Sequence, residues 1–86
     1  MTYRKTGEKD GLFILTDENG NKAFFDFLEM AVVDGIEYAA LLQVDIDECV
    51  ILQMNESNGS EEFYLIEDDC VFDKVASVFE EIFSED

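Results

Sequence analysis

The stretch between Val33 and Val44 constrains the fold more than any other part of the chain. It begins with the pair Asp34-Gly35, which favours the two-residue type I′ turn of a β-hairpin because both central residues of that turn need a positive φ angle. A strand follows, and its two alternating sets of side chains are Ile36, Tyr38, Ala40, Leu42 and Val44, and Glu37, Ala39, Leu41 and Gln43. Because the first set carries no charged or amide side chain, we expect it to face the hydrophobic core of a sheet.

Four further segments have the apolar composition and the alternation of β-strands, over residues 12–16, 23–27, 50–54 and 63–66. Gly20 suits the left-handed position of a three-residue loop between the first two of these strands, although a tighter turn at Asn19-Gly20 is also compatible. The alternation loses phase after Phe27, which predicts a bulge or a break at Leu28-Glu29. The short connections between successive strands indicate antiparallel neighbours.

After residue 67 the apolar period changes from two to about 3.6 residues, which is typical of an amphipathic helix. The apolar stripe consists of Phe72, Val75, Ala76, Phe79, Ile82 and Phe83. Asp68 or Asp69 can cap the N-terminus of this helix. We therefore predict the α+β class: an antiparallel sheet of about five strands with one C-terminal helix packed on one face, in a single domain over residues 11–86. Residues 1–10 are polar and show no periodicity, so we expect a flexible N-terminal tail.

Charge is the strongest compositional signal, because 22 Asp and Glu residues against five Lys and Arg residues give a formal net charge of −17. Such a surface repels phosphate backbones and anionic lipid headgroups, so we expect no direct nucleic-acid binding and no membrane binding. Two interpretations stay open, a basic partner protein and plain solubility. Cys49 and Cys70 lack the spacing of a disulfide framework, and no window approaches the roughly 18 apolar residues of a membrane span. We therefore expect a cytoplasmic protein with two free thiols.

The residue types favour a protein that is not an enzyme. The chain contains no His, and no Ser, Thr or Cys lies in a recognisable nucleophile motif, so the usual proton shuttle near neutral pH is missing. The carboxylate groups Asp68-Asp69 and Asp45-Asp47-Glu48 leave one weaker alternative, an enzyme that uses paired carboxylates as glycosidases do. We expect no catalytic residue and no cofactor.

One segment partly copies a calcium-binding loop. Asp17, Asn19 and Asn21 occupy what would be its first, third and fifth positions. Lys22 and Leu28 then stand where such a loop needs Gly and a bidentate Glu. We therefore interpret the segment as a hairpin turn and expect no metal site.

Four segments match a known family in order and spacing, namely Ile14 to Gly20, Asp34 to Val44, Ile66 to Asp69 and Val75 to Glu81. On these segments the chain resembles the domain of unknown function 1292 family, small acidic proteins of Gram-positive bacteria. The resemblance covers about residues 12–83. One departure is Gln43, where the family often has Pro. The resemblance implies a cytoplasmic bacterial protein and supplies no catalytic residue, because the family has no established activity.

The second face of the predicted sheet is half apolar, and one helix cannot cover both faces. Ala39 and Leu41 lie on this face, and we expect Phe24 and Ile51 to join them from neighbouring strands. An apolar patch on an open sheet face marks an interaction site, which predicts a homodimer or a partner docked over Leu41. Ordinary surface hydrophobicity, or coverage by the N-terminal tail, is the competing interpretation.

The sequence alone does not establish an activity. We predict a non-catalytic protein-binding module for a basic partner, with Phe24, Ala39, Leu41 and Ile51 as the candidate interface. The alternative is a small homo-oligomeric structural protein that associates through the open sheet face.

Overall fold

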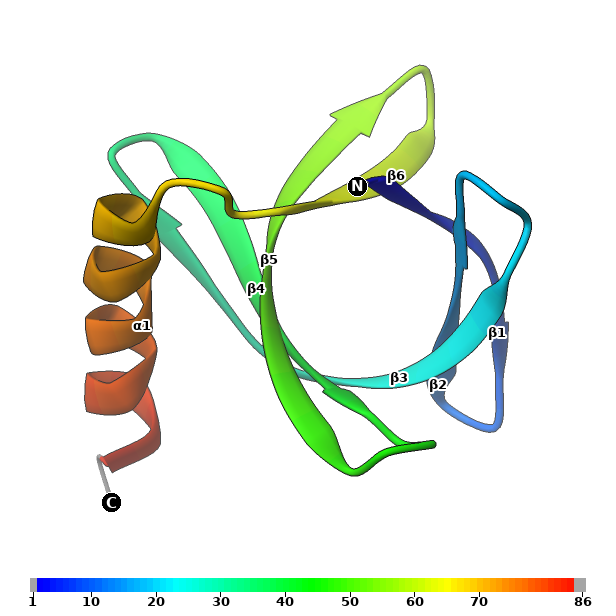
Figure 1. Cartoon of the computed structure of the whole chain (residues 1–86), viewed down its shortest axis with the longest axis horizontal. Helices are drawn as coiled ribbons and strands as arrows, with labels where there is room; N and C mark the ends of the chain where they lie inside the picture. The colour runs from blue at the N-terminus through cyan, green and yellow to red at the C-terminus, as the bar shows by residue number, and fades with distance from the viewer. Residues whose placement is uncertain (1, 85–86) are drawn as a thin grey trace.

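The chain forms a closed barrel of six antiparallel strands with one helix on its outside (Figure 1). This computed structural model describes residues 2–84, so residues 1, 85 and 86 of the predicted tail and domain lie outside the described residues. The elements in chain order are β1 (Thr2–Lys9), β2 (Leu12–Asp17), β3 (Lys22–Val33), β4 (Ile36–Gln43), β5 (Glu48–Ser57), β6 (Ser60–Leu65) and α1 (Asp69–Ser84). The predicted α+β class with one C-terminal helix is confirmed within residues 2–84, whereas the predicted number of about five strands is one too low.

Strand β1 corrects the prediction of a flexible tail over residues 1–10. Asp10 and Gly11, with φ angles of 54° and 81°, form the turn that joins this strand to β2. On its other edge β1 pairs with β6, and this pairing closes the barrel. The ring of Tyr3 contacts the ring of Phe25 inside the barrel, with 6.2 Å between their centres. Backbone pairing on both edges stabilises β1. This segment therefore forms a strand although its mostly polar side chains show no hydrophobic alternation.

The interior of the barrel is packed with apolar side chains that are at most 2% exposed. They are Leu15, Phe25, Ala39, Leu41, Leu52 and Phe63. Each strand from β2 to β6 contributes at least one of them. In a barrel of so few strands, inward-facing side chains are sufficient to fill the inside.

A second apolar cluster lies between the barrel and α1. Its buried members are Val33, Tyr38, Ala40, Val75 and Phe79. Tyr38 and Ala40 are buried in it, as predicted, but Ile36 and Val44 of the same alternating set are 39% and 37% exposed. The centre of β4 therefore buries both faces, one inside the barrel and one under the helix.

Helix α1 begins directly after its cap, Asp68. The Oδ1 atom of Asp68 accepts hydrogen bonds from the backbone N–H groups of Cys70 at 2.9 Å and Val71 at 3.3 Å. This confirms one of the two predicted caps. Phe72 was expected on the buried stripe but is 41% exposed, because only the turns that contain Val75 and Phe79 press on the barrel.

The β3–β4 hairpin carries both irregularities predicted from the sequence. Asp34 and Gly35 have φ angles of 53° and 79°, as a type I′ turn requires. The register between β3 and β4 shifts between Phe27 and Glu29, so Leu28 forms the predicted bulge. Beyond the bulge the hairpin runs beside α1 and away from the closed part of the barrel (Figure 1).

Asp17 organises the loop between β2 and β3. Its Oδ1 atom accepts hydrogen bonds from the backbone N–H groups of Asn19 and Asn21, both at 2.9 Å. Gly20 has a φ of 85°, in the predicted left-handed position. The backbone hydrogen bond from Asn21 is the main reason that the pKa of Asp17 lies below its ordinary value of 3.8. The residues that copy a calcium loop thus stabilise a turn.

Replacing Asp17 with alanine should destabilise the protein more at pH 7 than at pH 2. A carboxylate with a lowered pKa contributes stability above its ordinary value of 3.8, and this contribution is lost as the pH falls through the lowered value. Urea unfolding of both proteins at each pH measures the difference. Asp17→Asn, which keeps an acceptor oxygen without the charge, should lose less than the alanine variant at pH 7. A destabilisation that is equal at both pH values would contradict the expectation.

Candidate protein-binding site

The four residues predicted as an interface do not share a surface. Ala39 and Leu41 are 0% exposed, because the sheet closes on itself and turns this face into the barrel interior. Ile51 packs under α1 with the second apolar cluster, and Phe24 is half-buried on β3, opposite Ile14 of β2. The expectation of a homodimer or a partner docked over Leu41 is corrected by this burial.

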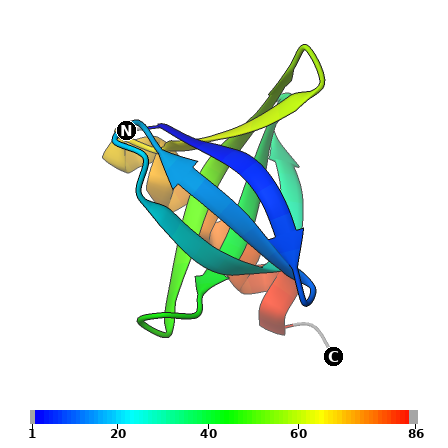
Figure 2. The same ribbon diagram turned by 90° about the vertical axis from the view of Figure 1, so that its right-hand side faces the viewer.

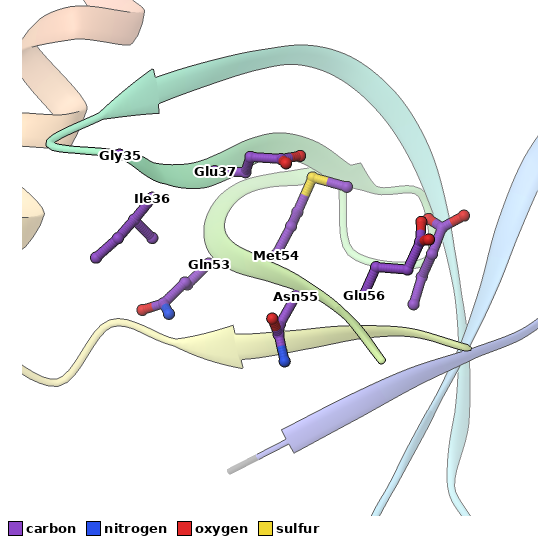
Figure 3. Close-up of a pocket in the computed structure, with 8 residues that line it drawn as sticks. Gly35, Ile36, Glu37, Gln53, Met54, Asn55 and Glu56 are labelled. Atoms are coloured by element: carbon purple, nitrogen blue, oxygen red, sulfur yellow. The ribbon is translucent and has the colours of Figure 1, made fainter. Parts of the chain in front are cut away.

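A hollow opens where the β3–β4 and β5–β6 hairpins separate (Figure 3). Pairing between β4 and β5 ends at Tyr38 and Gln53, and beyond this pair the two strands border a space of about 470 Å³. The lining residues are Gly35, Ile36, Glu37, Gln53, Met54, Asn55, Glu56 and Glu61. Figure 3 shows Glu37, Met54 and Glu56 pointing to the same side of these strands. Two carboxylates and a thioether therefore share one face beside the hollow.

The electrostatics of the hollow are dominated by carboxylates. Glu56 and Glu61 lie directly opposite each other on β5 and β6, an arrangement that destabilises a sheet because like charges repel. The Nζ atom of Lys5 lies 4.0 Å from Oε1 of Glu61, but only 2.6 Å from Oε1 of Glu8. The same ammonium group lies 4.1 Å from the centre of the Phe13 ring. Lys5 thus pairs more closely with Glu8 than with Glu61, and among the described residues no ion pair includes Glu56.

Apolar surface accompanies these carboxylates. Met54 lines the hollow, and Val32, which lies opposite Glu37 on the neighbouring strand, is 61% exposed. The side chains of Lys and Arg match this mixture, because their aliphatic stems cover apolar surface while their charged heads pair with carboxylates. The residues of this site come from three strands that meet only in the folded chain, so no sequence motif marks them, and net charge was the only signal that could have indicated the site.

The other candidates from the sequence do not assemble into a site. Asp68 caps α1, and Asp17 stabilises a turn. Cys49 and Cys70 are free thiols at the surface. Within residues 2–84, no group of three or more Cys, Asp or Glu side chains is placed to hold a metal ion. Over the same residues, none of the helical structure has the length and apolar character needed to cross a membrane.

Comparison with known proteins places the chain among uncharacterised bacterial proteins. The family model described as "Protein of unknown function (DUF1292)" matches residues 18–84. A UPF0473 protein of Heliobacterium modesticaldum is 45% identical over 82 residues, which cover 92% of each chain. A UPF0473 protein of Pelotomaculum thermopropionicum is 39% identical over 83 residues, 92% of this chain and 94% of the relative. One from Clostridium botulinum is 35% identical over 75 residues, 84% and 88% of the two chains. No solved structure matches the chain.

Proposed function

The chain belongs to the DUF1292 family of proteins of unknown function, and from the geometry of its hollow we propose that it is a non-catalytic module that binds a basic segment of a partner protein. The observation that carries the proposal is that Glu56 and Glu61 lie opposite each other at the hollow, where Lys5, at 4.0 Å from Glu61 and 2.6 Å from Glu8, offsets only part of their negative charge. A cationic side chain from a partner would relieve this repulsion.

The proposal rests on the match between the hollow and a lysine or arginine side chain. The aliphatic stem would lie along Met54, and the charged head would pair with Glu56 and Glu61. The net charge of −17 supports the same partner class, since it accelerates association with a basic protein and opposes association with a second copy of this chain. The free thiols of both cysteines support a place in the bacterial cytoplasm.

The test is the binding of a fluorescent, acetylated lysine-rich peptide to the full chain, measured by anisotropy at low and at high salt. The double variant Glu56→Gln/Glu61→Gln should weaken binding at low salt by about tenfold or more, because two charge-assisted contacts are lost. The matched control is Glu80→Gln/Glu81→Gln, which changes the net charge equally at two exposed positions of α1. We expect the control to weaken binding by less than about threefold.

Equal losses in the two double variants would contradict the proposal, because binding would then depend on net charge and not on the hollow. Undetectable binding of the peptide by the unchanged protein at low salt would also contradict it. High salt should weaken binding to the unchanged protein, since part of the attraction is long-range and screened.

A further inference from the structure

Within residues 2–84, strand β3 has a long edge without a neighbouring strand. It pairs with β4 from Phe25 to Val33, but with β2 only from Lys22 to Phe25. The far half of β3 therefore lies at the outer margin of the sheet, where the barrel wall parts from the β3–β4 hairpin (Figure 2). Unpaired strand edges present backbone N–H and C=O groups to whatever approaches them.

The turn determines which backbone groups of β3 point to this free edge. Antiparallel pairs alternate between hydrogen-bonded and non-hydrogen-bonded, and a two-residue turn is flanked by a hydrogen-bonded pair, here Val33 and Ile36. Counting back from Val33 places Val32 and Met30 in non-hydrogen-bonded pairs, so their N–H and C=O groups point away from β4. The hydrogen bonding of Met30 agrees with this orientation. Its N–H donates to a side-chain atom, Oε1 of Glu29, at 3.1 Å and not to the backbone of β4.

The side chains along this edge are apolar and exposed. Met30 is 44% exposed and Val32 is 61% exposed, and both lie on the face of the hairpin that is turned away from α1. The flanking side chains are acidic: Glu29 precedes Met30, and Glu37 lies opposite Val32. An edge with apolar centres and acidic flanks is complementary to an extended segment in which apolar and basic residues alternate.

We propose that an extended basic segment of the partner protein adds to β3 as a further strand, bonded to the backbone of Met30 and Val32. This inference rests on the proposed function, which supplies the positive charge of the segment. The free edge of β3 supplies the position at which the segment binds. A lysine of the segment pairs with the Glu29 carboxylate and draws it away from the Met30 N–H, which then donates to a carbonyl of the added strand. Glu29 thus covers the edge until a basic strand arrives.

A second copy of the chain fits this edge less well. Two copies paired along β3 would bring the Glu29 side chain of each chain to the shared ladder, and each chain carries a net charge of −17. Like charges opposite each other destabilise paired strands. The negative charges along the edge therefore favour a basic partner segment over a second copy of the chain.

The test uses a seven-residue, acetylated and amidated peptide of alternating Lys and Val, with a fluorescent label. Val32→Pro removes the outward N–H without touching a bond to β4, and proline is tolerated where the N–H of an edge strand faces solvent. We expect this variant to bind the peptide at least about tenfold more weakly. Val32→Ala is the matched control, because it loses side-chain surface but keeps the N–H, and it should stay within about threefold.

A second arm leaves the protein unchanged, so it does not depend on the folding of the proline variant. The same peptide with alternate backbone amides N-methylated keeps every charge but cannot pair along one edge. It should bind at least about tenfold more weakly, and only the unmethylated peptide should slow hydrogen exchange at the Val32 amide. If both peptides bind equally, strand addition is wrong while the proposed function stands. If neither binds, both are wrong.

Discussion

Replacing Leu41 with glutamine is expected to remove most of the free energy of unfolding of the protein. Leu41 is 0% exposed inside the barrel, so the loss of its apolar burial costs about 2 to 5 kcal/mol. The buried amide without a partner costs about 1 to 3 kcal/mol more. A domain of this size has a free energy of unfolding of about 4 to 13 kcal/mol, so the substitution removes most of it.

Urea unfolding followed by far-UV circular dichroism measures this effect. Leu41→Met is the matched control, because it keeps the volume and apolar character and should cost less than about 1.5 kcal/mol. A glutamine variant with a native spectrum and an unchanged unfolding midpoint would show that the barrel interior admits water at this position.

Phe79→Ala has the second largest expected effect, a loss of about 3 to 5 kcal/mol. Phe79 is 2% exposed and packs with Val75 against Tyr38 and Ala40, in the cluster that holds α1 on the barrel. Because α1 meets the rest of the described chain mainly through this cluster and the Lys74–Asp34 ion pair, we expect α1 to detach before the barrel unfolds. The helical signal near 222 nm should therefore fall at a lower urea concentration than the barrel signals.

Phe83→Ala is the control for this experiment. Phe83 is 52% exposed, and its ring stacks on Phe79 with 6.2 Å between the ring centres. Its loss should cost no more than about 1 kcal/mol. NMR signals of the Leu41 methyl groups report the barrel separately from the helix. If Phe79→Ala and Phe83→Ala shift the unfolding midpoint equally, the cluster around Phe79 does not anchor α1.

The proposed class of partner follows from charge, which the sequence shows, whereas the candidate site could not be predicted from the sequence. A net charge of −17 indicates a basic partner in general terms. Glu37 lies far from Glu56 and Glu61 in the sequence, and no spacing marks the three among 22 acidic residues. They meet because β4 and β5 part beyond Tyr38, which depends on the register of the whole sheet.

Features that depend on local backbone chemistry were determined by the sequence itself. Asp34-Gly35 forms the expected turn because few residue pairs accept two positive φ angles. Leu28 forms the expected bulge because apolar residues on either side of it change phase. Asp68 caps α1 because its short carboxylate reaches the first free N–H groups of the helix.

Which face of each strand lies inside was decided only by tertiary structure. Alternation separates Tyr38 and Ala40 from Ala39 and Leu41, but both sets are apolar enough to be buried. Closure of the barrel placed Ala39 and Leu41 inside, and α1 covers Tyr38 and Ala40 from outside. At the centre of β4, the sheet face that was expected to be open to solvent is therefore buried. Closure also explains why the polar segment β1 forms a strand. Pairing with β2 and β6 satisfies the hydrogen-bonding capacity of its backbone N–H and C=O groups, whatever its side chains are.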